Sequence, residues 1–231
     1  MREVNPCLIL THNGLELTKK CVESIRKQTV STTLMVVDNG STDNTNQWLE
    51  ADRWPVVCSF GENRGVSRGW NFGLTKLFGD GWPHVLVVGS DTILPPTFYE
   101  DLLSFNLPFV TGCGFDTMDQ AMQAAWMTPL DSHPEFNTFL IKREVWERVG
   151  EFDNRMVSWA GDCDYHVRAH RLGINLWKAG VPFYHHGSAT LKNAHVDERV
   201  KLHEQAHHDR EVFKSIYNCL PGTPAYEKLF E

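Results

Sequence analysis

The sequence predicts an α/β fold with a mainly parallel central sheet flanked by helices. Three observations carry this prediction. From residue 6 to about residue 112, short apolar runs alternate with amphipathic stretches. Parallel strands are buried on both faces and need helical crossovers, so this alternation is typical of βα units. The 231 residues and the 42% hydrophobic content are sufficient for a substantial core.

The first half contains the regular part of the pattern. Strands are expected, in order, at 7–11 (CLILT), 33–38 (TLMVVD), 56–60 (VVCSF), 84–88 (HVLVV) and 109–114 (FVTGCG). Helices are expected between them at 15–28, 42–53, 66–78 and 95–105. Ser41, Thr42 and Asp43 supply capping side chains for the second helix, and Pro95 and Pro96 suit the first turn of the fourth.

The second half is less regular. After a loop-rich stretch, the pattern predicts a strand at 137–142, helices at 143–150 and 162–173, and two short strands at 174–179 and 181–186. A polar helical tail follows from residue 195 to about 217. No repeat or Pro/Gly-rich linker divides the chain, so we expect a single domain over 1–231, with halves at 1–112 and 113–194 and the tail at 195–231.

Charge and cysteine content exclude several classes of function. The formal net charge is −7 and no long Lys/Arg cluster occurs, which argues against general nucleic-acid binding. Six cysteines without a CxxC pair favour a reducing compartment. No stretch approaches the roughly 20 apolar residues of a membrane span, and the N-terminus lacks a secretory run. We therefore expect a cytoplasmic protein without a transmembrane segment.

Polar side chains follow three of the predicted strands. Thr11, His12 and Asn13 end the first strand, Asp38 ends the second, and Asp91 follows the strand at 84–88. Each alone fits a turn or a helix cap. Because a ligand crevice lies outside the carboxyl ends of parallel strands, the coincidence of three predicts a ligand site.

The type of ligand follows from the side chains available. Neither GxGxxG nor GxxxxGK[ST] occurs, which disfavours the common dinucleotide cradle and the P-loop. Asp38 can accept hydrogen bonds from a ribose or a base, and Asp91 can bind a divalent cation that bridges two phosphates. The stretch 61–73 (GENRGVSRGWNFG) adds a helix N-terminus with Arg64 or Arg68 nearby for a phosphate. These features predict a nucleoside diphosphate compound.

Four blocks of the sequence resemble one known family. The sequence LILTHNGLELTKKCVESIRKQT, followed by MVVDNGSTDNT, NRGVSRGWNFG and VVGSDTILPP, resembles family-2 glycosyltransferases of the GT-A fold, in particular a rhamnosyltransferase-like branch. Downstream, FDNRMVSWAGDCDYHVRAHRLG resembles the acceptor-side block and VPFYHHGSAT the histidine motif. The resemblance covers roughly residues 6–190. It implies a Rossmann-like sheet and an inverting transferase that moves a sugar from a UDP- or dTDP-sugar to an acceptor hydroxyl, with Mn²⁺ or Mg²⁺ as cofactor.

The resemblance also implies roles for single residues. Asp91, with His185 or His186, would hold the metal, and Asp162 would be the general base. Asp164 is the rival base, because a capping role would tie Asp162 to backbone N–H groups. The donor contacts expected are Thr11, Asn13, Asp38, Asn63, Gly65, Arg68, Asn71 and Ser90.

Departures from the family pattern leave a second class open. Gly89 and Gly161 stand where relatives carry acidic or amide side chains, and Trp70 stands where many keep a polar residue. A catalytically degenerate protein that binds a nucleotide sugar is therefore the alternative to an enzyme. The sequence does not identify the acceptor, and it is compatible with a homodimer. Trp126 and Trp159 could each stack on a sugar or lie in the core.

The tail contains a zinc-protease pattern that needs its own explanation. HEQAH, at 203–207, fits HExxH, but its flanks are charged on most faces and no third ligand follows at a suitable spacing. A solvated helix is the better interpretation.

Overall fold

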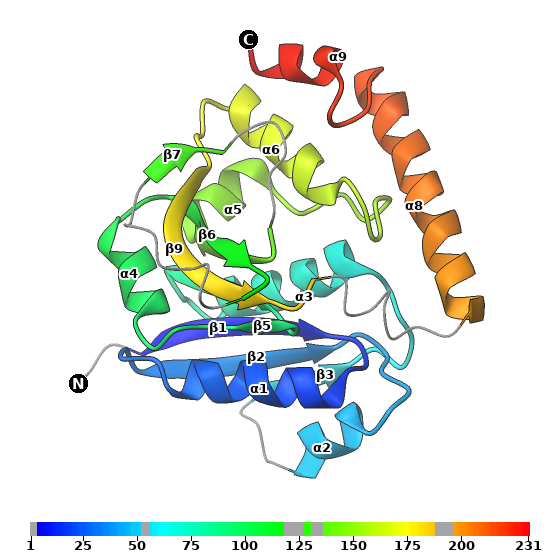
Figure 1. Cartoon of the computed structure of the whole chain (residues 1–231). Helices are drawn as coiled ribbons and strands as arrows, with labels where there is room; N and C mark the ends of the chain where they lie inside the picture. Colours follow the sequence, from blue (N-terminus) through cyan, green and yellow to red (C-terminus); the bar gives the residue numbers. More distant parts are fainter. Residues whose placement is uncertain (1–3, 52–55, 118–126, 131–135, 188–195) are drawn as a thin grey trace.

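The computed structural model describes residues 4–51, 56–117, 127–130, 136–187 and 196–231. In these residues, one mixed sheet of nine strands forms the centre, with helices on both of its faces (Figure 1). The strand order is β3-β2-β1-β4-β8-β6-β9-β5, and β7 pairs with β9. The α/β class predicted from the sequence is confirmed.

The bounds of the strands agree well with the predicted apolar runs in the first half. The strands are β1 (Asn5–Thr11), β2 (Thr32–Asp38), β3 (Val56–Ser59), β4 (His84–Gly89), β5 (Thr92–Ile93), β6 (Phe109–Phe115), β7 (Met127–Pro129), β8 (Thr138–Lys142) and β9 (Trp177–His185).

The helices cover the two faces of this sheet. They are α1 (Leu15–Arg26), α2 (Thr45–Ala51), α3 (Val66–Gly79), α4 (Phe98–Ser104), α5 (Arg143–Val149), α6 (Gly161–Arg171), α8 (Val196–Tyr217) and α9 (Pro224–Glu227), followed by a 3-10 turn at Lys228–Phe230. Pro95 and Pro96 precede α4 rather than forming its first turn, which is a small correction to the predicted helix start.

The sheet is more mixed than the sequence indicated. β3, β2, β1 and β4 run parallel as predicted, but β8 is antiparallel to both β4 and β6. β9 is antiparallel to β5 and β7 and parallel to β6. The apolar runs of the second half are as continuous as those of the first, because both faces are covered there too. Periodicity alone therefore could not distinguish the two strand directions.

One long strand, β9, replaces the two short strands expected at 174–179 and 181–186. It is Trp177–His185, and its register with β6 shifts between Thr111 and Cys113. Pro182 pairs with Cys113 just past that irregularity. Bulges are where a strand can accommodate a proline, so the Gly-Val-Pro sequence did not break the strand.

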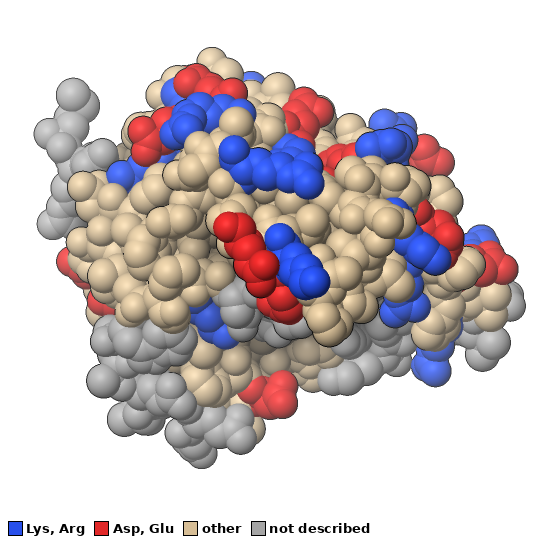
Figure 2. All heavy atoms as spheres, turned by 90° about the horizontal axis from the view of Figure 1, so that it is seen from above, with Lys and Arg blue, Asp and Glu red and all other residues tan. Residues whose placement is uncertain are grey.

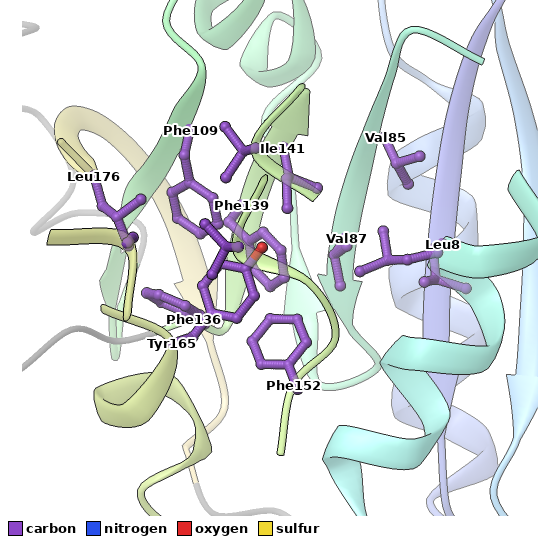
Figure 3. Close-up of a cluster of buried hydrophobic side chains, with 14 of the residues drawn as sticks. Leu8, Val85, Val87, Phe109, Phe136, Phe139, Ile141, Phe152, Tyr165 and Leu176 are labelled. Carbon is purple, nitrogen blue, oxygen red and sulfur yellow. The ribbon is translucent and has the colours of Figure 1, made fainter. Parts of the chain in front are cut away.

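Alternating residues of the strands pack into two apolar layers, one on each face of the sheet. Leu8 and Val87 face the α3 side with the aromatic cluster of Phe109, Phe136, Phe139, Phe152 and Tyr165 (Figure 3). Cys7 and Ile9 face the opposite side, where Val22 and Ile25 of α1 pack. The period of two along β1 thus fixes which side each helix covers.

The long helix α8 runs along one side of the molecule, next to α6 (Figure 1). Its Phe213 and Tyr217 are buried with Met156, Ala160 and Cys163 in a third apolar cluster. His203, Glu204 and His207 are exposed, as the solvated-helix interpretation predicts. No group of three His, Cys, Asp or Glu side chains arranged for a metal occurs in the described residues.

Charge is dispersed over the surface seen in Figure 2. Lys and Arg side chains stand beside Asp and Glu side chains there, and much of this face carries neither. Within the described part of the chain, no helix combines the length and apolarity that a membrane crossing requires.

Candidate active site

The carboxyl ends of β2, β1 and β4 lie next to one another. Thr11 is paired with Asp38, and Leu10 with Gly89, in the parallel register of these strands. Asp38 and Asp91 are therefore delivered to the same edge of the sheet from strands on either side of β1, which is the arrangement predicted from the sequence.

Asp38 is a buried carboxylate held in a fixed orientation. Its side chain is 0% exposed. Oδ1 accepts a hydrogen bond from the backbone N–H of Ser41 (3.1 Å), and Oδ2 accepts one from Ser59 Oγ (3.0 Å). One oxygen is thus oriented by the turn after β2 and the other by the end of β3.

Asp91 and His185 come together at this edge although 93 residues lie between them in the chain. β5 and β9 pair Thr92 with His185, which brings the imidazole beside the β4–β5 turn. His185 Nε2 lies 3.3 Å from Asp91 Oδ2, and each side chain is 22% exposed. The structure therefore brings together the two residues for which a shared metal was expected.

The spacing of these two atoms fits a shared divalent cation. Two neighbouring ligands at 2.0–2.1 Å from an octahedral metal are about 3 Å apart. The Nε2–Oδ2 distance is already close to that value. With two protein ligands, the remaining positions would fall to water and to substrate phosphates, a common arrangement for Mg²⁺ and Mn²⁺.

His186 has a different place from His185. Its backbone N–H donates to the Asp91 carbonyl (2.9 Å), and its Nδ1 lies 3.1 Å from the Tyr184 hydroxyl. Successive residues of a strand point to opposite faces. Of the two histidines, His185 is therefore the one whose ring lies beside the Asp91 carboxylate, whereas the backbone of His186 holds the β4–β5 turn.

A side chain at Gly89 would be in tight contact with its neighbours. A Cβ at this position would lie 3.1 Å from the Asn137 carbonyl oxygen and 3.2 Å from Asp91 Oδ1. The Gly89 N–H also donates to that carbonyl (2.8 Å). Asn137, which the sequence analysis did not identify, occupies the space of a side chain here, and its Nδ2 lies 3.5 Å from His185 Nδ1.

Asn13, at the end of β1, is hydrogen-bonded to the turn that follows β2. It has a left-handed backbone (φ 57°), which Asn adopts more readily than most residues. Its Oδ1 accepts hydrogen bonds from the N–H groups of Thr42 (2.7 Å) and Asp43 (3.3 Å). Asp43 in turn accepts from the N–H groups of Leu15 and Thr45. Burial opposes ionisation of Asp43, but these hydrogen bonds outweigh it and lower its pKa.

Asn39 joins the Asp38 turn to the start of α3. It is buried, its Nδ2 donates to Asn63 Oδ1 (3.0 Å) and to the Gly65 carbonyl (3.2 Å), and its Oδ1 accepts from the Arg64 N–H (2.9 Å). Gly65 has φ 85°, and a Cβ there would clash with Val157. Asn39 was missed from the sequence, although its position directly after Asp38 marked it.

Three predicted donor contacts have structural partners. Thr11 is buried and its hydroxyl lies 2.8 Å from that of Thr18. Asn71 Nδ2 donates to the Phe152 carbonyl, and its Oδ1 accepts from the Phe152 N–H, both at 2.8 Å. Asn63 Oδ1 accepts from the Gly65 N–H (2.9 Å). Arg68 is exposed on the first turn of α3, and Ser90 is half-buried beside Asp91.

The two candidate bases occupy different environments at the start of α6. Asp162 is partly exposed, and its Oδ1 accepts from the Cys163 N–H (2.8 Å). Asp164 is 2% exposed and accepts hydrogen bonds from Arg168 Nε (2.8 Å) and Tyr217 Oη (2.7 Å). Both oxygens of Asp164 therefore have strong internal donors, and Asp162 is the more exposed of the two carboxylates.

The thiols near the site are neutral. Burial raises the pKa of Cys21 to about 12. Burial also raises the pKa of Cys163, and the neighbouring Asp162 carboxylate adds to this. Because the thiolate is the reactive form, these cysteines act as core residues, as the sequence analysis expected.

A separate hollow lies away from the strand-end residues. Its volume is about 340 Å³, and it is lined by residues of α6, α9 and the segments around β7 and β9, among them His166, His170, Leu176 and Phe230. None of the predicted site residues contributes to its lining. Trp159 packs against the third apolar cluster, whereas Trp126 lies outside the described residues.

Comparison with known proteins gives these features a context. Residues 7–106 match glycosyl transferase family 2. An uncharacterised protein of Mycobacterium bovis is 25% identical over 156 residues, which cover 60% of this chain and 60% of the relative. The chain thus matches less than two thirds of the length of that relative.

Solved structures share the fold at low identity. A mannosyltransferase from Pyrobaculum calidifontis, in complex with GDP-Man and Mn²⁺, superposes with a TM-score of 0.64 at 17% identity, over 99% of this chain and 68% of that one. Glucosyl-3-phosphoglycerate synthase from Mycobacterium tuberculosis, in complex with Mg²⁺ and UDP, gives 0.59 at 16% identity, over 93% and 79%. These similarities are to the GT-A fold and leave the rhamnosyltransferase-like branch without specific support.

Proposed function

We propose that this chain, whose residues 7–106 match glycosyl transferase family 2, transfers a sugar from a UDP- or dTDP-sugar to an acceptor hydroxyl, with inversion at the sugar carbon. The catalytic unit would combine the nucleotide-sugar half, 1–112, with the acceptor-side half, 113–194. The observation that carries the proposal is the Asp91–His185 pair, 3.3 Å apart, at the same sheet edge as the buried Asp38.

Donor binding would use the strand-end residues in order. Asp38 is 0% exposed and both of its oxygens accept hydrogen bonds, so donor binding would have to open the turn at Ser41. Asp38 would then accept hydrogen bonds from the base or the ribose. Asp91 and His185 would hold Mn²⁺ or Mg²⁺. When bound, the cation would stabilise the negative charge that develops on the leaving diphosphate. Arg68, exposed at the start of α3, would add a positive charge for the phosphates.

Asp162 would act as the general base on the acceptor side. Its Oδ1 is oriented by the Cys163 N–H, so the carboxylate is presented from the first turn of α6 in a defined direction. It would take the proton of the acceptor hydroxyl as the oxygen attacks the sugar carbon and the bond to the diphosphate breaks. A positioned base typically contributes about 10²–10⁴-fold in rate.

One property of the start of α6 supports a direct displacement. Only one accessible carboxylate is present at the α6 start, because Asp164 is engaged by Arg168 and Tyr217. The absence of a second accessible carboxylate there fits a direct displacement better than a covalent intermediate.

A nucleotide-sugar-binding protein without turnover is the second candidate. It is favoured by the absence of side chains at Gly89 and Gly161, where a Cβ would lie 3.1 Å from the Asn137 carbonyl oxygen and 3.0 Å from Ser67 Oγ, respectively. These positions cannot supply the extra carboxylates that relatives have.

A thermal-shift screen of nucleotide sugars with Mn²⁺ tests donor binding. A ligand at 100 times its Kd stabilises a protein by about 2.7 kcal/mol, and each kcal/mol raises Tm by roughly 2–4 °C at this chain length. We expect a rise of about 5–11 °C with UDP- or dTDP-sugars, smaller with chelator. A response to GDP-sugars alone would correct the donor, and no response to any nucleotide would refute the proposed function. Product analysis of the binding donors then separates the enzyme from the binding protein.

A further inference from the structure

The long helix α8 carries a buried carboxylate, Asp209, which is 0% exposed. Its Oδ2 accepts hydrogen bonds from the backbone N–H groups of Ser158 (2.7 Å) and Trp159 (2.8 Å), and Ser158 Oγ lies at 3.3 Å. On the other side, Gln205 Nε2 donates to Oδ1 (2.9 Å), and His208 Nδ1 lies 3.4 Å from it. Hydrogen bonds to an ionised acceptor are among the stronger ones in proteins.

The segment that Asp209 binds leads directly into α6. Ala160 precedes the helix and has a left-handed backbone with φ 60°. A non-glycine residue is costly there and persists only when the surroundings impose it. The hydrogen bonds to the N–H groups of Ser158 and Trp159 supply such a constraint at the two residues before the strained one, and Asp162 follows two residues after it.

The same segment is also attached to α3 and, once more, to α8. The Val157 carbonyl accepts from the Val66 N–H, and the Met156 carbonyl accepts from Ser67 Oγ, both at 2.7 Å. Arg210 of α8 lies over the Trp159 ring, 4.8 Å from its centroid. Residues 156–160 are thus held between the N-terminus of α3, which belongs to the donor half, and the C-terminal helix.

We propose that Asp209 is a positioning residue for the transfer reaction: it fixes the turn at 158–160 and thereby the direction in which Asp162 is presented to the acceptor. This inference rests on the proposed function, because it assumes that Asp162 is the base. Asp209 contacts no substrate. Its effect passes through the backbone, so its loss changes the catalytic step and leaves the donor pocket at Asp38 and Asp91 intact.

The test compares Asp209→Ala with Asp209→Asn in the full chain. Alanine removes both acceptors, whereas asparagine keeps one oxygen for the two N–H groups if the Gln205 amide turns over. Thr223→Ala is the matched control. It removes the cap of α9, where the Thr223 side chain accepts from the Tyr226 N–H, and so perturbs the same C-terminal region without touching 158–160.

Two measurements are made on each variant. The first is hydrogen exchange of the amides at 158–164 by mass spectrometry. The second is hydrolysis of a UDP-sugar with Mn²⁺, with kcat separated from the Kd of the donor. We expect Asp209→Ala to exchange at least tenfold faster in this segment and to lose at least tenfold in kcat with an unchanged donor Kd. Asp209→Asn should recover most of both, and Thr223→Ala should change neither.

Three results would overturn the inference. They are unchanged exchange at 158–164 in Asp209→Ala, an unchanged kcat despite faster exchange, and an equal loss of kcat in Thr223→Ala. A wild-type chain that binds donors but turns none over would instead refute the proposed function, so the two failures are distinguishable.

Discussion

The two carboxylates at the start of α6 give the sharpest prediction, because one side chain should matter for catalysis and the other for stability. The perturbation is a pair of nearly isosteric substitutions, Asp162→Asn and Asp164→Asn. Each removes one negative charge and leaves one oxygen as an acceptor. The structure predicts opposite consequences for them.

The magnitude for Asp164 follows from its partners. Its carboxylate is 2% exposed and accepts from Arg168 Nε and Tyr217 Oη at 2.8 and 2.7 Å. Removal of one partner from a buried ion pair costs about 3–5 kcal/mol. The Arg168 side chain is 27% exposed and also donates to the carbonyls of Val149 and Glu151, which reduces the loss. We expect about 2–3 kcal/mol of lost stability for Asp164→Asn.

For Asp162→Asn, the expected effect is a loss of kcat. Loss of a general base costs about 10²–10⁴-fold in kcat, which corresponds to roughly 3–5 kcal/mol of barrier. Asp162 is partly exposed and accepts a hydrogen bond from the adjacent Cys163 N–H, which an asparagine oxygen can also accept, so Asp162→Asn should change the free energy of unfolding by less than about 1 kcal/mol.

Urea unfolding and turnover of a UDP-sugar with Mn²⁺ are the assays, each run on both variants and the wild type. Turnover is expressed per folded molecule. The reasoning would be refuted if Asp164→Asn abolished turnover while its stability was unchanged, or if Asp162→Asn kept full turnover.

The remaining predictions concern the metal, the acid side of the pH range and the core. His185→Ala should weaken Mn²⁺ binding about tenfold or more, because water replaces the imidazole beside Asp91. Isothermal titration in the presence of UDP measures this, and an unchanged affinity would show that His185 is not a metal ligand. Hydrogen bonds from Arg155 lower the pKa of Asp153, so its contribution to stability is present above the unfolded-state pKa, about 4, and is lost as the pH falls through the lower folded-state pKa. The free energy of unfolding of Asp153→Asn should accordingly decline less steeply below about pH 4 than that of the wild type, and parallel curves would contradict this. Phe139→Ala should lower the free energy of unfolding by about 3–5 kcal/mol in urea, because this ring is 0% exposed among Phe109, Phe136 and Phe152. A loss below about 1 kcal/mol would show that the aromatic cluster is not a packed core.

The parallel half of the fold could be predicted from the sequence because its signal is local. The runs at 7–11, 33–38 and 84–88 are each followed by polar residues and an amphipathic helix, and periodicity records both. The direction of β8 and the continuity of β9 are set by pairing with distant strands, such as Thr138–Lys142 with β4 and Trp177–His185 with β6. Local patterns contain no information on such pairings.

The candidate site shows the same division. Asp38 and Asp91 were predicted because the carboxyl ends of parallel strands meet at one edge. The partners that decide which neighbouring residue is accessible were not predictable. Tyr217 reaches Asp164 from α8, and the Asn137 carbonyl lies beside Gly89. In the sequence, Asp209 is one of many charges on a polar helix. Its contact with residues 158 and 159 exists only in the folded chain.

We expect this chain to turn over a nucleotide sugar with the help of a cation held by Asp91. The most direct measurement is hydrolysis of UDP- and dTDP-sugars by the wild type and by Asp91→Ala, each with Mn²⁺ and with chelator. Asp80→Ala, which removes an exposed carboxylate paired with Lys76, is the control. The account predicts Mn²⁺-stimulated hydrolysis in the wild type and the control, and a loss of that stimulation of at least about 10²-fold in Asp91→Ala. Full Mn²⁺-stimulated hydrolysis by Asp91→Ala would contradict it.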